Sequence, residues 1–98
     1  MALDIHKIEN GKTSELLFSI SDSLYSIFEP AFNDYKNKTG LYIDPYGKLK
    51  LSSGLTTLIE VLTHAMNQND KHVDSYQRLI NTLKNADKNN YGIIFEGD

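Results

Sequence analysis

The spacing of hydrophobic residues changes along the chain and predicts a mixture of strands and helices. The segment Leu3 to Ile8, in which Leu3 and Ile5 alternate with polar residues, is followed by the turn dipeptide Asn10-Gly11, which is typical of a short strand that ends in a tight turn. Beyond this turn apolar residues recur at steps of three and four, which predicts an amphipathic helix from about Ser14 to Asn37. Its apolar positions are Leu16, Leu17, Ile20, Leu24, Ile27, Phe28, Ala31 and Tyr35.

The start of this helix has a second interpretation. If residues 15–20 instead form the second strand of a hairpin around the preceding turn, the helix begins only at Ser21. We favour the longer helix, which Gly40 ends. Pro30 has no backbone N–H to donate and predicts a kink, or a junction between two helices, near Glu29.

A hairpin is predicted over residues 41–51. Asp44, Pro45 and Gly47 suit the first, second and fourth positions of a type I turn, because of side-chain hydrogen bonding, a preset φ and conformational tolerance. Alternation within the hairpin separates a core face from a solvent face. We expect Leu41, Ile43, Leu49 and Leu51 on the core face, and Tyr42, Lys48 and Lys50 on the other.

Two further helices and a final strand complete the pattern. Ser52-Ser53-Gly54 precedes the second helix, and Asp70 is placed to cap a third helix that ends near Asn89. The segment 91–96 has the apolar composition of a strand. The predicted order is β-α-β-β-α-α-β, in a single α+β domain over residues 1–98 with a largely antiparallel sheet and helices on one face.

Composition narrows the classes of function. Thirteen acidic and ten basic residues give a net charge of −3, and there is no cysteine, which excludes disulfides, thiol catalysis and cysteine-based metal sites. The acidic balance and the single arginine, Arg78, argue against nucleic-acid binding. No apolar run reaches the roughly 18 residues of a membrane span. The first residues, 1–6, lack the basic and then apolar pattern of a signal peptide. We expect a cytoplasmic protein without cofactor or membrane attachment.

Residues with catalytic chemistry are scattered, so we do not expect an enzyme. Glu60 and His64 lie one turn apart on the polar side of their helix, which indicates a solvated surface pair. The alternative chemical site is Ser52-Ser53-Gly54, near Lys48 and Lys50, where backbone donors at a helix start could bind an anion. The same residues also serve as an ordinary helix cap, and we favour that interpretation.

The segment 87–98 resembles the calcium-binding loop of an EF hand at some positions. Oxygen-bearing residues occupy the first and third positions, and Gly92 the sixth. Tyr91 stands at the fifth position, where an oxygen ligand is needed, and Asp98 replaces the bidentate glutamate at the end. These departures favour a helix-to-strand turn without metal.

The long predicted helix carries two series of side chains at steps of seven residues, one aromatic and one acidic. Seven residues are almost two turns, so each series would form a line along the helix. We predict a partner-facing ridge, in which aromatic side chains supply contact energy and carboxylates attract a basic surface; a central, buried helix is the alternative. The candidate partner-binding residues are Glu15, Asp22, Glu29 and Asp34, the aromatic residues Phe18, Tyr25 and Phe32, and Tyr42 and Tyr46 of the hairpin.

Six tyrosines, an acidic balance and the segments Phe28–Tyr35 and Leu41–Leu51 stand together in this small chain. In these features it resembles the small immunity proteins that bacteria make against their own toxic effectors, including those of contact-dependent growth inhibition. The resemblance implies a non-enzymatic inhibitor that covers the active site of a cognate protein toxin. Many such toxins are nucleases with cationic grooves, against which carboxylates would act as phosphate mimics.

Three alternatives to a toxin inhibitor are kept. The first is a phage-encoded inhibitor or nucleic-acid mimic, and the second is a small enzyme or anion-binding domain around Ser52-Ser53-Gly54. The third is a self-associating structural subunit, for which the wide apolar arc of the long helix would be the dimer face. The sequence leaves the choice between a monomer and a homodimer open.

Overall fold

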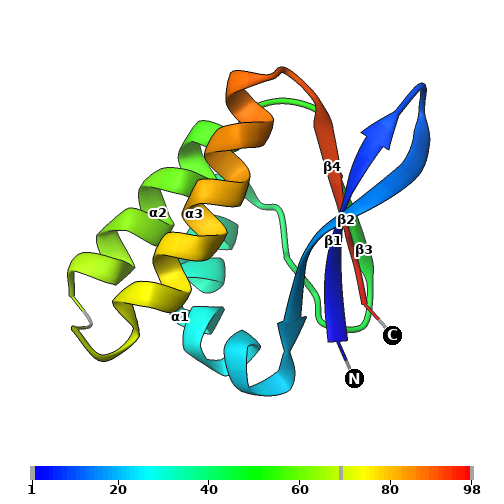
Figure 1. Ribbon diagram of the computed structural model, residues 1–98. Helices are drawn as coiled ribbons and strands as arrows, with labels where there is room; N and C mark the ends of the chain where they lie inside the picture. The colour runs from blue at the N-terminus through cyan, green and yellow to red at the C-terminus, as the bar shows by residue number, and fades with distance from the viewer. Residues whose placement is uncertain (1, 69, 98) are drawn as a thin grey trace.

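The structure, a computed structural model, describes residues 2–68 and 70–97. Over these residues the predicted fold class is confirmed, because three α-helices pack beside one four-stranded antiparallel sheet. The helices lie together on one side of the sheet (Figure 1). The elements in chain order are β1 (Ala2–Glu9), β2 (Lys12–Ser21), α1 (Asp22–Thr39), β3 (Lys48–Leu51), α2 (Leu55–Asn67), the 3-10 helix η1 (Asp70–His72), α3 (Val73–Lys88) and β4 (Gly92–Glu96).

The order of elements differs from the prediction near the start of the chain, where β2 stands in place of the first half of the expected helix. Asn10 and Gly11 both adopt positive φ, 52° and 77°, which is the conformation of a two-residue hairpin turn. The turn sets Glu9 opposite Lys12, and β2 then pairs with β1 as far as Ser21. The hairpin interpretation is therefore correct, and the observed order is β-β-α-β-α-α-β.

Irregular pairing in β2 explains why its sequence has the spacing of a helix. Phe18 lies opposite Ile5, but Leu16 lies opposite His6, so Leu17 is an extra residue and the alternation is broken. A second irregularity follows between His6 and Ile8. Since each bulge shifts which side chains point to the core, the apolar residues of β2 no longer follow a period of two.

α1 begins directly after β2 and runs as one helix through Pro30. The Ser21 hydroxyl accepts a hydrogen bond from the Leu24 N–H at 3.2 Å and caps the helix start. At the other end Gly40 has a φ of 79° and its N–H donates to the Lys36 carbonyl, as predicted. The predicted junction between two helices at Pro30 is therefore wrong.

The predicted hairpin over residues 41–51 forms only in part. The Asp44 turn is present, since the Gly47 N–H donates to the Asp44 carbonyl at 3.2 Å and the Tyr46 N–H donates to Asp44 Oδ1 at 2.9 Å. Residues 41–43 are not a strand, however, and Leu41 is exposed rather than in the core. β3 pairs with β4 instead, which places Leu49 opposite Phe95.

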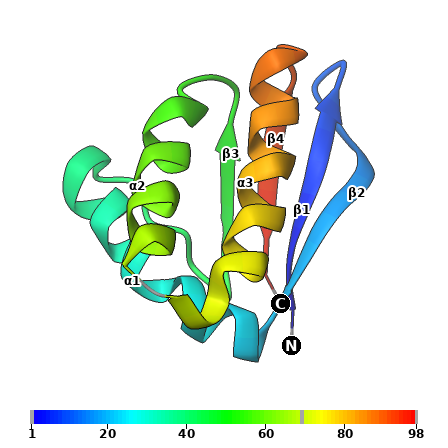
Figure 2. The same cartoon turned by 60° about the vertical axis from the view of Figure 1, so that its left-hand side comes forward.

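The sheet has the strand order β2-β1-β4-β3, which Figure 2 shows with α2 and α3 in front of it. One face carries Leu3, Ile5, Ile93 and Phe95, which are buried under the helices. The three helices complete the core with Phe28, Ala31, Phe32 and Tyr35 of α1, Leu55, Leu58, Val61 and Leu62 of α2, and Tyr76, Leu79, Ile80, Leu83 and Ala86 of α3.

Two predictions at the ends of α3 have different outcomes. Asp70 does not cap α3, because it lies in the 3-10 turn before it and His72 occupies the cap position without a side-chain bond. Asn89 ends α3 as expected, and the chain turns into β4 at Asn90, which has a positive φ of 58°.

Within the described part of the chain, no helix is long and apolar enough to cross a membrane.

Candidate protein-binding site

The outer side of α1 and the loop that follows it enclose a shallow hollow of about 260 Å³. We call it the α1 hollow. Four of the predicted partner-binding residues meet here, although they come from two separate segments of the chain. The hollow is lined by Asp22, Tyr25, Ser26 and Glu29 of α1 and by Pro45 and Tyr46 of the loop.

Tyr25 holds the loop against α1. Its hydroxyl donates a hydrogen bond to the Ile43 carbonyl at 2.7 Å, and its ring packs 5.5 Å from the ring of Phe32. Burial, the neighbouring Tyr42 hydroxyl and the negative charges of Glu29 and Asp44 raise the pKa of Tyr25 far above its usual range. The phenol therefore stays protonated and remains a hydrogen-bond donor at neutral pH.

The loop presents two tyrosines to solvent, and both are candidate partner-binding residues from the sequence. Tyr46 is 67% exposed at the rim of the α1 hollow, and Tyr42 is 43% exposed beside Tyr25. The Lys36 ammonium lies 4.8 Å from the centre of the Tyr42 ring, a cation–π contact. The Tyr42 ring is thus exposed yet held by a contact, and such a ring loses little freedom on binding, which suits it to protein contacts.

The acidic residues do not form one line along α1. Asp22 and Glu29 are exposed and lie on the α1 hollow, but Glu15 is on β2, outside the helix. Asp34 faces α2 instead, where it lines a separate hollow with Pro30 and lies 3.7 Å from the Lys38 ammonium. The predicted acidic line is thus reduced to two residues, because the helix is shorter than expected.

The predicted aromatic line is also broken. Phe32 is fully buried, with ring centres 5.9 Å from Phe28 and 6.5 Å from Phe95, so it belongs to the core. Phe18 lies on β2 opposite Ile5 and is half-buried against the same core. Both residues were predicted to contact a partner. For Phe32 this is wrong, because the sheet packs against that side of α1 and buries the ring, whereas for Phe18, which lies on β2 and keeps part of its surface exposed, the contact stays a prediction.

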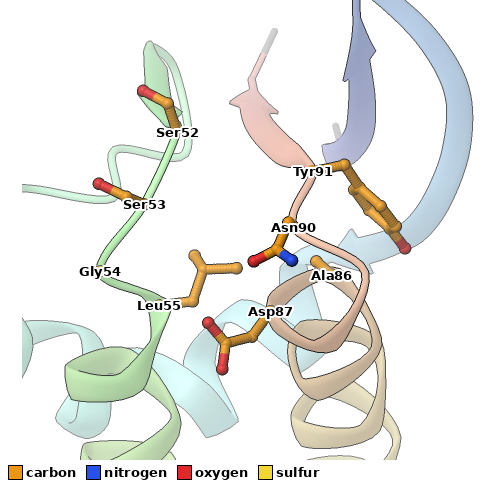
Figure 3. A pocket seen from close by; sticks show the side chains of 8 residues that line it. All are labelled: Ser52, Ser53, Gly54, Leu55, Ala86, Asp87, Asn90 and Tyr91. Carbon is orange, nitrogen blue, oxygen red and sulfur yellow. The ribbon is translucent and has the colours of Figure 1, made fainter.

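The alternative site around Ser52-Ser53-Gly54 forms a hollow of about 130 Å³ between α2 and α3, which we call the α2–α3 hollow (Figure 3). Gly54 takes the cap position of α2 with a φ of 73°, and no side chain caps the helix. The Asp87 carboxylate lines the same hollow, and its negative charge opposes the binding of an anion. Lys48 and Lys50 are not among its lining residues.

The face of the sheet away from the helices pairs most of its charges internally. Lys48 lies 3.7 Å and His6 3.6 Å from the Glu96 carboxylate, and the Ser19 hydroxyl donates to Asp4 at 2.7 Å. Each of these two carboxylates therefore has a partner on the sheet itself.

No protein-family model, curated protein or solved structure matches this chain. The chemistry of the α1 hollow therefore follows from its own side chains, which are two carboxylates, two tyrosines, a serine and a proline. Among the described residues there is no group of three side chains that could hold a metal ion. What the lining offers is hydrogen-bond acceptors and aromatic surface, which suit a basic partner.

Two lining residues were missed by sequence reasoning. Ser26 carries no chemical signal in the sequence beyond its place one turn after Asp22, on the same face of the helix. Pro45 was recognised only as a turn residue, and the position of that turn relative to α1 depends on the contact between Tyr25 and Ile43.

Proposed function

We propose that this protein is a non-enzymatic inhibitor, an immunity protein that binds a cognate toxin in the cytoplasm and covers a basic part of its surface. The observation that carries the proposal is the α1 hollow, which combines two exposed acidic residues with an exposed tyrosine. Asp22 and Glu29 come from α1, and Tyr46 comes from the loop.

Physical chemistry supports this combination as a protein contact. Tyrosine is enriched at the centres of interfaces, where its ring supplies apolar area and its hydroxyl a hydrogen bond. Carboxylates attract a positively charged partner from a distance and speed up association. A toxin that acts on a polyanion such as a nucleic acid has the basic surface that such a site fits.

The direct test uses the toxin that is encoded next to the gene of this protein. We expect an equimolar amount of the protein to abolish the toxin's activity, and the two to co-elute in size-exclusion chromatography. Toxin activity that is unchanged by an excess of the protein would refute the proposal.

Paired variants locate the contact. Glu29→Gln and Tyr46→Ala should each weaken the complex by about five-fold to ten-fold, measured by titration calorimetry. Glu60→Gln is the matched control, because Glu60 is also an exposed helical acid but lies on α2. If the control weakens the complex as much as Glu29→Gln, the effect reflects net charge and the α1 hollow is not the contact.

A further inference from the structure

We infer that Gly97 is a positioning residue, which holds the loop between α1 and β3 so that the exposed Tyr46 stands at the rim of the α1 hollow. We call this loop, residues 40–47, the α1–β3 loop. The observation behind the inference is a close approach of two backbones, between Gly97, directly after β4, and the turn at residues 45–47. The effect on binding rests on the proposed function, whereas the placement of the loop does not.

The α1–β3 loop carries most of the exposed apolar side chains. Among the described residues five large hydrophobic side chains are exposed, and three of them, Leu41, Tyr42 and Tyr46, belong to this loop. Single exposed apolar residues are ordinary on a protein surface, but several on one short loop are typical of a contact surface. The position of this loop therefore matters for any partner that binds here.

The α1–β3 loop has no regular secondary structure, so its position depends on contacts with other segments. The Ile43 carbonyl accepts the 2.7 Å hydrogen bond from the Tyr25 hydroxyl of α1. The Gly47 carbonyl accepts a second bond of 2.7 Å, from the Gly97 N–H. Tyr46 lies between these two attachments and directly beside the second. The loop is thus held by a helix on one side and by the end of the sheet on the other.

Gly97 allows the turn to lie unusually close. Its hydrogen bond to Gly47 extends the pairing between β3 and β4 by one residue. The turn then passes directly over Gly97, since a Cβ atom added there would overlap the Pro45 carbonyl group and lie 2.9 Å from the Tyr46 nitrogen. Every residue except glycine has a Cβ atom, so a substitution at this position must displace the backbone that carries Tyr46.

The backbone determines where the Tyr46 ring stands. The ring itself is 67% exposed, but the Tyr46 N–H donates to Asp44 Oδ1 at 2.9 Å, and Tyr46 borders the α1 hollow. A loop that is already ordered loses less conformational entropy when a complex forms. Displacing this turn should therefore weaken the complex through the position of Tyr46.

The first test needs no toxin. In the natural protein, NMR should show a nuclear Overhauser effect between the Gly97 α protons and the Tyr46 N–H, and slow hydrogen exchange of the Gly97 N–H. In Gly97→Ala, the amide signals of Tyr46 and Gly47 should shift, and the N–H of residue 97 should exchange about ten-fold faster or more. Signals from the core should stay in place.

Gly92→Ala is the matched control, because it adds the same methyl group at the other end of β4. There the nearest atom to an added Cβ, the Leu51 carbonyl oxygen, is 3.3 Å away, so the Tyr46 signals should not move. Absence of the Overhauser effect in the natural protein would overturn the inference without the use of any variant. Unchanged Tyr46 signals in Gly97→Ala would overturn it as well.

The second test measures the complex by titration calorimetry. Gly97→Ala should weaken toxin binding by about three-fold to ten-fold. In a protein that already carries Tyr46→Ala, the same change should have less than about a two-fold effect, because Gly97 acts through Tyr46. Equal effects with and without the Tyr46 side chain would overturn the positioning role. If the toxin is not bound at all, the proposed function fails, and the NMR result alone decides whether Gly97 sets the position of the loop.

Discussion

The inner and outer faces of α1 differ in the side chains that they carry. On the inner face Phe28 and Phe32 are fully buried. Phe28 packs edge-on against Tyr76, and their ring centres lie 5.1 Å apart. On the outer face Glu29 is exposed, and the neighbouring aromatic group is Tyr46, which comes from a different segment. The aromatic residues of the helix thus stabilise the fold, while the loop supplies the aromatic group that a partner can contact.

This difference predicts that stability and the proposed binding can be changed separately in this molecule. Tyr25 connects the two faces, because its ring packs on Phe32 while its hydroxyl holds the loop at Ile43. Changes on the inner face should lower the free energy of unfolding, and changes on the outer face should affect binding alone.

The largest expected effect comes from the inner face. Phe32→Ala should lower the free energy of unfolding by about 3–5 kcal/mol, because it leaves a cavity between α1 and the sheet. Denaturation in urea, followed by circular dichroism, measures the change. Phe32→Leu keeps most of the volume and should cost clearly less. A loss below about 1 kcal/mol for the alanine variant would contradict the buried position of Phe32.

Pro30, on the side of α1 that borders α2, is expected to change stability with the opposite sign. Pro30→Ala restores an N–H that can donate to the Ser26 carbonyl, and proline is about 3 kcal/mol less favourable than alanine inside a helix. We expect a stabilisation of about 1–3 kcal/mol in thermal or urea denaturation. A destabilised variant would show that the proline ring contributes packing, since Pro30 also lines the hollow between α1 and α2.

Alkaline pH should weaken the contacts of three tyrosines. Burial raises the pKa of Tyr25, Tyr35 and Tyr76, so the folded protein holds these protons more tightly than the unfolded chain does. The contribution of these tyrosines to the free energy of unfolding is fully present below pH ~10, which is the pKa of tyrosine in an unfolded chain. It is lost as the pH rises above this value.

The free energy of unfolding should fall by up to about 1.4 kcal/mol per pH unit for each of these tyrosines. Urea denaturation between pH 9 and pH ~11.5 measures it, and the Tyr25→Phe variant should show a smaller slope than the natural protein. Stability that does not fall above pH ~10 would mean that these phenols ionise as easily in the folded state as in the unfolded one.

The smallest effect on stability is expected at the exposed rim of the hollow. Tyr46→Ala should change the free energy of unfolding by less than about 0.5 kcal/mol, because the side chain is 67% exposed. The same variant should weaken toxin binding, so one protein sample separates stability from binding. A large loss of stability in Tyr46→Ala would show instead that the loop and the core are coupled.

Much of the fold follows from local patterns in the sequence. The alternation over β1, the turn at Asn10-Gly11 and the strand β4 were predicted correctly. The boundary between β2 and α1 was not, because the bulges that break the alternation around Leu17 depend on the partner strand. A pattern of apolar residues alone does not show where such a bulge lies.

The candidate site was predicted in part for the same reason. Asp22, Tyr25 and Glu29 lie on one side of α1, as steps of three, four and seven residues along a helix require. Tyr46 was a candidate as a tyrosine of the predicted hairpin, but its place beside these residues results from the packing of the loop. The burial of Phe32 was missed because its ring contacts Phe95, which lies far away in the sequence.

By itself the sequence determined the features that depend on residues close together along the chain. The φ preferences of Gly11 and Gly40 and the hydrogen bonds of the Asp44 turn act over a few residues, so a local pattern predicts them. Only the tertiary structure decided which aromatic residues are buried and which are exposed to solvent. Burial depends on segments that are distant along the chain, and here the sheet covers one side of α1 while the loop around Tyr46 borders the other.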